Sequence, residues 1–239
     1  MKRRLKINGM IIFLAVLLSA IFPSFFLKDE RFHPFDEFTE IFGIAFILLG
    51  QLFRLSARGY KVEFSRQGSF LIQDGPYGLV RHPMYLGIFL IGIGIVLVIF
   101  KWWVLLLFLV VFSWRYILLI FKEENELSFK FGRAHQDYQK KTPLFFPSLK
   151  MILQEDIAEY VPLKFSWLKK EIGPMLAILL LTLAVESGED ICRGGLKAYS
   201  RELILFSLIL TLFILLIIYL IDRGRGSNQN DSGKSKINL

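Results

Sequence analysis

The chain has 239 residues, is 54% hydrophobic and carries a formal net charge of +8. Its apolar residues stand in blocks, and their share is too high for an ordinary soluble domain of this length. The single cysteine, Cys192, excludes an intramolecular disulfide and a cysteine-based metal site, and three scattered histidines indicate no metal. The basic balance does not indicate a nucleic-acid partner, because no basic motif interleaved with aromatic residues stands outside the apolar blocks.

The first apolar block, residues 7–27, follows the basic start MKRRLK and is about long enough to span a bilayer as a helix. Leu18 stands where a signal peptide needs a small residue before Ala20. We therefore predict a retained helix rather than a cleaved signal. The helix is expected to bend or end near Pro23.

A second, shorter block at residues 41–53 needs its flanks to cross the membrane, and we predict that a cytoplasmic loop begins at Arg54. Between residues 86 and 121 only Lys101 and Arg115 are charged. This pattern predicts two helices joined in a tight hairpin near Lys101. Periodicity leaves open whether the hairpin spans the bilayer fully or is partly re-entrant.

The polar residues 122–148 are predicted to begin as a continuation of the second hairpin helix. Leu127, Phe131 and His135 fall at helical spacing, so one face is expected to pack while the charged residues stay solvated. Residues 151–171 mix charged and bulky apolar side chains, which indicates a segment that lies along the inner membrane interface.

We predict an all-α fold, a polytopic bundle of transmembrane helices with about six membrane segments that include the tight hairpin. Helices are expected because lipid offers the backbone no hydrogen-bond partners. The last two segments are expected at about residues 172–187 and 202–221. The predicted divisions are an N-terminal helix with an outer loop (1–37), a core with the candidate site (38–148), an interfacial segment with two membrane helices (149–222) and a disordered tail (223–239).

Lysine and arginine sort strongly to one side of this arrangement if the N-terminus is cytoplasmic. The basic start, the loops on both sides of the hairpin and the C-terminal tail then face the anionic lipid of the inner leaflet. The sequence thus predicts an integral membrane protein with both termini in the cytoplasm, in the inner membrane if the source is bacterial.

Polar groups stand at both ends of the hairpin, in GPYGLVRHPMYLG and in FKEENE. Because a hairpin brings its ends together, Arg81 and His82 are expected to meet Glu123 and Glu124 at the inner membrane surface. Such a pair beside an apolar cavity suits a zwitterionic cofactor with a sugar diol, since His or Arg binds a carboxylate and Glu accepts hydroxyl hydrogen bonds.

Taken singly, most of these residues have a structural interpretation, with Arg81 as a topology anchor, Tyr85 as an interfacial residue and the glutamates as a solvated helix end. The joint pattern is what favours a site. Arg115 differs, because a charge inside a membrane helix needs a partner or a function, although it could also snorkel or stack on an aromatic ring. Three glycines either permit close helix contact or leave room for a ligand: Gly87, Gly92 and Gly94.

The combination resembles the isoprenylcysteine carboxyl methyltransferase family, to which membrane phospholipid N-methyltransferases are related. GPYGLVRHPMYLG, the later EENELSFKFGRAHQDY and the closing TPLFFP show the resemblance over roughly residues 40–148. The family signature is an RHPxY step, an apolar hairpin, a Glu-Glu pair, an FG step, a Tyr-rich stretch and a proline end. His135 stands where the family usually has a tyrosine, a departure expected to change the polarity of the site.

An NADPH-dependent membrane reductase of the sterol type is an alternative, because such enzymes have a similar RHPNY step. Their second half reads Arg-Asp, then Cys, then Lys-Tyr-Gly, where this chain has Glu-Glu, no cysteine and Phe-Gly. A 2′-phosphate would also prefer basic groups at the position of the two carboxylates. Both differences favour the methyltransferase interpretation.

The resemblance implies an enzyme that uses S-adenosylmethionine as the methyl donor. By position, it implies that His82 and Tyr85 hold the amino-acid end of this cofactor, with Arg81 in support. It likewise implies that Glu123 and Glu124 hold the ribose and adenosine end.

The implied acceptor is a lipid-like or prenylated small molecule or peptide that enters from the bilayer. A carboxylate acceptor needs no general base, whereas an amine must first be neutral. Because the sequence shows no dedicated base near the site other than His135, it favours carboxyl O-methylation, with Arg115 as a candidate to orient the acceptor carboxylate. Phospholipid N-methylation and a non-catalytic membrane scaffold are the remaining alternatives, and the oligomeric state stays open.

Overall fold

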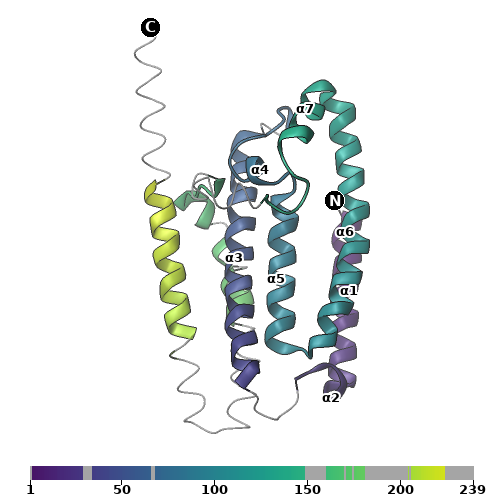
Figure 1. The fold of residues 1–239 in the computed structure, drawn as a ribbon, viewed down its shortest axis with the longest axis vertical. Helices are drawn as coiled ribbons and strands as arrows, with labels where there is room; N and C mark the ends of the chain where they lie inside the picture. Colours follow the sequence, from purple (N-terminus) through teal and green to yellow (C-terminus); the bar gives the residue numbers. More distant parts are fainter. Residues whose placement is uncertain are drawn as a thin grey trace.

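The structure, a computed structural model, describes residues 2–28, 34–65, 68–148, 160–169, 171–173, 175–180, 204 and 206–223. No residue in these ranges belongs to a β-strand, and an isolated bridge joins Leu27 to Phe100. The predicted all-α fold is confirmed. The labelled helices in Figure 1 are α1 (Lys2–Ile21), α2 (Pro23–Phe26), α3 (Pro34–Phe64), α4 (Pro76–Leu79), α5 (Pro83–Ile99), α6 (Trp102–Phe131) and α7 (Arg133–Lys141).

Three of the described helices are long and apolar enough to cross a membrane: Phe38–Phe64, Trp102–Phe131 and Phe206–Arg223. Two more of the predicted segments, Pro83–Ile99 and Glu171–Leu180, are shorter apolar helices. These findings fit the predicted membrane fold. Cys192, the interfacial stretch before residue 160 and residues 224–239 of the predicted tail lie outside the described residues, while Arg223 ends the helix Phe206–Arg223.

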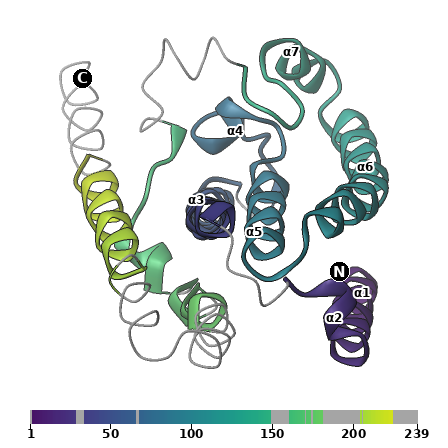
Figure 2. The same ribbon diagram turned by 60° about the horizontal axis from the view of Figure 1, so that its bottom comes forward.

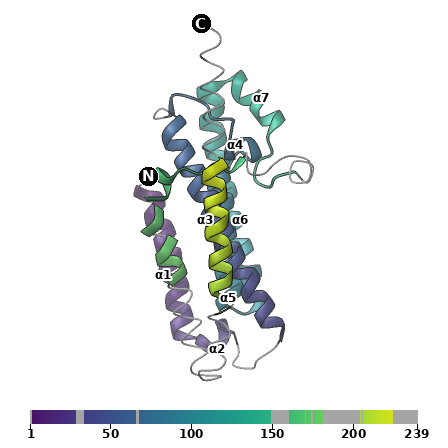
Figure 3. The same ribbon diagram turned by 90° about the vertical axis from the view of Figure 1, so that its left-hand side faces the viewer.

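The long helices run side by side along one axis (Figure 3). Seen from one end, α3 lies between the α5–α6 hairpin and the helix of residues 206–223 (Figure 2). Figure 1 shows α4 and α7 together at one end, and α2 with the α5–α6 turn at the other. The segments that hold the candidate site residues therefore share one end of the bundle.

The N-terminal helix ends as predicted, because α1 stops and Pro23 starts the short α2. α2 then packs against the hairpin turn, where the ring of Trp103 lies 5.0 Å from that of Phe25 and 5.3 Å from that of Phe26. The backbone N–H of Lys101 donates to the carbonyl of Phe26 at 3.0 Å. The turn of the hairpin is thus held in place by α2.

α3 continues from Arg54 to Phe64 as one helix, so the predicted loop beginning at Arg54 is wrong over this stretch. The residues SARGYKVEF contain no proline that would end the helix. Trp167 covers the helix at Gly59, where an added Cβ would stand 2.3 Å from the indole ring. Tertiary packing, which the local sequence does not reveal, stabilises these extra turns.

α3 and α5 cross with their backbones in contact at two levels. A Cβ on Gly50 would stand 2.6 Å from the carbonyl oxygen of Gly87, and one on Gly43 would stand 2.8 Å from that of Gly94. The glycines of α5 at these levels therefore permit close helix contact, which is one of the two interpretations that the sequence left open. At Gly92 the neighbour is instead a ring of α6.

α6 continues beyond its apolar block to Phe131, which confirms the predicted helical continuation. It ends at Gly132, whose φ of 52° lies in the left-handed region that favours glycine. His135 therefore lies on α7. The single helical face predicted through Leu127, Phe131 and His135 is wrong, because the chain turns between the second and the third of these residues.

Replacing Gly50 by alanine is expected to lower thermal stability, because the new methyl group would meet the backbone of α5 at 2.6 Å. Overpacking costs about 1–3 kcal/mol, against about 1 kcal/mol gained in helix propensity. Gly173→Ala is the matched control, since nothing lies within 4 Å of its added Cβ. Thermal unfolding of both variants in detergent checks this, and equal melting temperatures would contradict the close helix crossing.

Candidate functional site

Glu124, near the C-terminal end of α6, is the centre of the candidate site and is only 8% exposed. His82 Nε2 lies 2.8 Å from its Oε1, and the Arg81 guanidinium forms an ion pair with its Oε2. The side-chain amide of Gln139 on α7 donates to Oε2 at 2.8 Å. Burying a carboxylate is costly unless it is paired and hydrogen-bonded, and here groups from two other segments meet that need.

Glu123, the residue before Glu124, contacts a tyrosine hydroxyl and a lysine. The Tyr85 hydroxyl donates to its Oε2 at 2.8 Å, and Lys61 Nζ of α3 lies 3.6 Å from its Oε1. His82 Nδ1 lies 3.9 Å from Oε2, and its ring stacks on that of Tyr85 with the centroids 5.6 Å apart. The predicted meeting of the two hairpin ends is confirmed, since the structure brings together Arg81, His82, Tyr85, Glu123 and Glu124.

The loop before α5 presents Arg81 and His82 because both of its ends are fixed. Gly75, with a φ of 58°, precedes α4, and Pro83 occupies the first turn of α5, where a backbone N–H is not required. Between them the N–H of Arg81 donates to the carbonyl of Pro143 at 2.9 Å. The two side chains are thus held toward α6.

Two tyrosines tie α7 and α3 to this loop. The Tyr138 hydroxyl donates to the carbonyl of Tyr77 at 2.6 Å, and the Tyr77 hydroxyl donates to the carbonyl of Ala57 at 3.4 Å. Burial raises the pKa of both phenols, so both stay protonated and act as donors.

His135 of α7 is fully buried beside Glu124, and neither ring nitrogen has a hydrogen-bond partner among the described residues. Its Nε2 lies 3.8 Å from Glu124 Oε2. Burial lowers the pKa of His135, the charges of Arg81 and His82 act in the same direction, and Glu124 opposes them. The imidazole is therefore neutral at pH 7.

Arg115 is not part of the ion pairs around Glu124, and its buried Nε has no hydrogen-bond partner in the part of the chain that the structure describes. Arg115 directly precedes Tyr116 on α6, and Arg54 of α3 lies against α5 at Gly87, where an added Cβ would stand 3.1 Å from Arg54 Cβ. The Tyr116 ring lies 5.3 Å from that of Tyr85. Tyr85 thus connects the glutamates to a second region with two arginines.

An aromatic row continues from Tyr116 between α5 and α6. Phe112 stacks on Tyr116 with the ring centroids 4.0 Å apart, and Phe89 lies 4.9 Å from Phe112. Phe145 and Phe146, from the TPLFFP stretch, lie 5.5 and 5.8 Å from Phe89. The site therefore changes from ionic groups at one end to aromatic side chains at the other.

Three residues near the site were not predicted from the sequence: Arg54, Lys61 and Gln139. Arg54 and Lys61 fell in the predicted loop, so no helix face was assigned to them. The only signal for Gln139 is its place beside Tyr138 in the Tyr-rich stretch. The contact between His135 and Glu124 was also missed, although His135 itself was noted.

Residues 38–134 match the phospholipid methyltransferase family. The chain is also 32% identical over 112 residues to the protein-S-isoprenylcysteine O-methyltransferase of Schizosaccharomyces pombe (strain 972 / ATCC 24843). That alignment covers 44% of this chain and 48% of the relative, so the chain spans about half the length of the relative. No solved structure matches the chain.

All six site residues predicted from the sequence lie within the matched region, which also contains two of the three helices of membrane-spanning length. The comparisons agree with the resemblance that the RHPMY step and the Glu-Glu pair showed. Residues 38–134 are therefore similar to the phospholipid methyltransferase family, in a chain that also contains helices long and apolar enough to cross a membrane.

Proposed function

We propose that the chain is an S-adenosylmethionine-dependent membrane methyltransferase that methylates the carboxylate of a lipid-like or prenylated acceptor. The family match and the isoprenylcysteine O-methyltransferase relative support the reaction class. The observation that most supports it is the buried ionic cluster of Glu124 with Arg81 and His82, next to the aromatic row.

The side chains of the cluster fit the proposed cofactor, whose amino-acid end has a carboxylate and whose ribose has two hydroxyls. Arg81 Nε and both ring nitrogens of His135 are buried without partners among the described residues, so the site has unused hydrogen-bonding capacity. Because Arg81 and His82 face Glu124, the cofactor carboxylate is expected to share their donors. The proposed assignment gives Arg81, His82 and Tyr85 to the amino-acid end and Glu123 and Glu124 to the ribose and adenosine end.

S-adenosylmethionine supplies the methyl group for an in-line displacement when it is bound. The chain contributes alignment and an apolar site, and the rings beside Tyr116 exclude water. A carboxylate acceptor is already nucleophilic and needs no base. Arg115, joined by Arg54, is proposed to hold that carboxylate, because Arg115 precedes Tyr116 of the aromatic row, Arg54 lies against α5 at Gly87, and arginine pairs well with carboxylates.

We place the site at the cytoplasmic membrane surface, with both termini on that side. The support is the basic character of this end of the bundle, where Lys61 closes α3 and Lys140 and Lys141 close α7. If the source is bacterial, the membrane is the inner one. The acceptor then reaches the site laterally from lipid.

Glu123→Gln and Glu124→Gln are expected to weaken S-adenosylmethionine binding about tenfold to a hundredfold, because each loses a charge-assisted hydrogen bond worth about 1.5–3 kcal/mol. Glu126→Gln is the matched control, since this exposed glutamate of the same helix pairs with Lys122 alone among the described residues, at 4.0 Å. Titration calorimetry on the purified full chain measures all three. If the unmodified chain shows no binding at millimolar cofactor, the enzyme proposal is wrong.

The acceptor is tested by incubating the protein and labelled cofactor with an S-farnesylcysteine analogue and with phospholipid vesicles. Base-labile label in the analogue, the expected result, indicates a methyl ester. The family match favours phospholipid N-methylation as a second candidate, and base-stable label confined to the phospholipid would support it instead. A Glu124→Gln variant, expected to transfer less label at the same cofactor concentration, is the control in both arms.

His135 predicts a pH dependence of stability. The pKa of His135 is lowered in the folded chain. As the pH falls through the ordinary imidazole range, about 6.5, the unfolded chain therefore binds more protons than the folded chain. The stabilisation linked to neutral His135 is complete above that range and is lost below it. Thermal unfolding at about pH 7.5 and about pH 5.5 should show a larger loss for the unmodified chain than for His135→Phe, whose ring does not titrate. Equal losses would show that His135 is not buried in its neutral form.

A further inference from the structure

The described residues of the 160–180 segment lie outside the family match and pack along α3, to which they are hydrogen-bonded at several points. The Ser56 hydroxyl donates to the carbonyl of Pro162 at 2.7 Å, and the indole N–H of Trp167 donates to Glu63 Oε2 at 2.9 Å. The Gln51 side-chain amide donates to the carbonyl of Met175 at 3.3 Å. These bonds extend over much of the helix, so the segment is docked on α3 at several levels.

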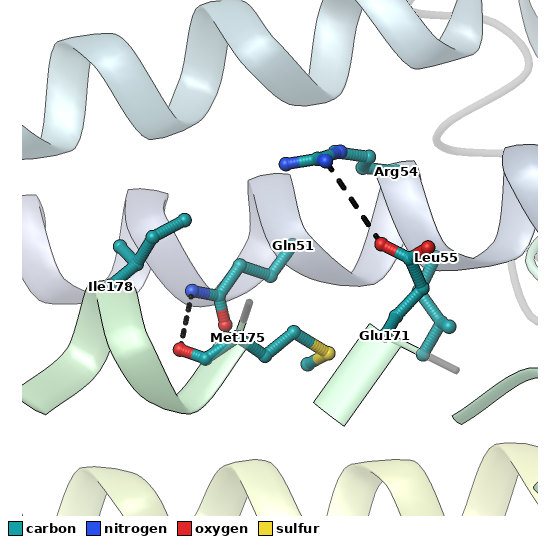
Figure 4. Close-up of a pocket in the computed structure, with 6 residues that line it drawn as sticks. All are labelled: Gln51, Arg54, Leu55, Glu171, Met175 and Ile178. Carbon is teal, nitrogen blue, oxygen red and sulfur yellow. Dashed lines mark hydrogen bonds and ion pairs between the residues drawn. The ribbon is translucent and has the colours of Figure 1, made fainter. Parts of the chain in front are cut away.

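Glu171 in this segment is buried and faces two arginines of α3. Its carboxylate lies 2.5 Å from Arg58 Nη1 but 4.0 Å from Arg54 Nη2. Figure 4 shows Glu171 reaching toward Arg54 across a small cavity, with Gln51 beside it. Gln51 Oε1 is buried there without a hydrogen-bond partner among the described residues. The two ion pairs differ in kind, because only the shorter one is within hydrogen-bond distance.

Arg54 forms the longer of the two ion pairs with Glu171. At 4.0 Å, Glu171 attracts the guanidinium without occupying its N–H donors. On its other side α3 touches α5, where a Cβ on Gly87 would stand 3.1 Å from Arg54 Cβ. Gly87 stands between Tyr85 of the ionic cluster and Phe89 of the aromatic row. Arg54 therefore stands between Glu171 and the region proposed to receive the acceptor.

We propose that Glu171 is a positioning residue, which orients Arg54 so that its guanidinium receives the carboxylate of the acceptor. The proposal rests on the proposed function and assigns a role in it to a segment outside the matched region. A nearby carboxylate offsets the cost of holding an arginine in an apolar setting and restricts its rotamers. The acceptor site is thus built from α3, α6 and the 160–180 segment, while the cofactor site is built from the hairpin ends.

The test compares Glu171→Gln with Glu63→Gln in the full chain. Both variants neutralise a glutamate that links the 160–180 segment to α3, but Glu63 pairs with Lys164 and Trp167 and not with Arg54. Glu171→Gln is expected to raise KM for the S-farnesylcysteine analogue about tenfold while the cofactor Kd stays the same. Glu63→Gln is expected to leave both constants unchanged.

A third variant separates positioning from loss of folding. Arg54→Lys should raise the same KM, and adding Glu171→Gln to it should produce little further rise, because both changes remove one interaction. If Glu171→Gln folds poorly, Glu171→Asp, which keeps the charge but shortens the side chain, replaces it and should also raise KM. Equal effects in Glu171→Gln and Glu63→Gln, a parallel change in cofactor Kd, or additive effects with Arg54→Lys would overturn the proposal.

Failure of the proposed function and failure of the positioning role of Glu171 give different results. If the unmodified chain binds no cofactor or transfers no label to the carboxylate analogue, the proposed function fails and this inference fails with it. If the unmodified chain methylates the analogue and Glu171→Gln has the same KM as the unmodified chain, only the positioning role of Glu171 is wrong.

Discussion

The structure depends on the pairing of one buried carboxylate, that of Glu124. A carboxylate removed from water destabilises a fold by several kcal/mol unless opposite charge and hydrogen bonds compensate it. Arg81, His82 and Gln139 supply that compensation from the loop before α5 and from α7. The same contacts close the hairpin at the end opposite its turn and dock α7. The local fold and the candidate cofactor site are therefore one set of interactions.

The helices of the bundle pack against one another in two different ways. α3 and α5 meet backbone to backbone at glycine positions, which makes them a close and rigid pair. α5 and α6 meet largely through the rings of Phe89, Phe108 and Phe112, reinforced by Phe145. An amphiphilic acceptor suits the second kind of contact, because aromatic side chains offer an apolar surface that leads to the ionic end of the site. The close pair of α3 and α5 supports this aromatic surface.

The 160–180 segment adds a second set of long-range contacts to the family region. Trp167 and Glu63, which form a hydrogen bond, are 104 positions apart in the chain. The segment extends the buried core along α3 through Val161, Leu163 and Met175. Under the proposed function, residues 38–134 would hold the cofactor, and the 160–180 segment would act on the acceptor site through Arg54. Such a division would let acceptor preference change without disturbing the cofactor site.

The sequence by itself determined the membrane character, the hairpin and the meeting of residues 81–85 with Glu123 and Glu124. Apolar blocks require helices in lipid, and a short turn brings the ends of two such helices together. The end of α3 and the contact of His135 with Glu124 were decided only by the tertiary structure. Trp167 stabilises the last turns of α3 from far along the chain, and Gly132 redirects α7 toward Glu124. Local residues determine periodicity and charge, whereas the choice of partner for a helix face depends on contacts between distant segments.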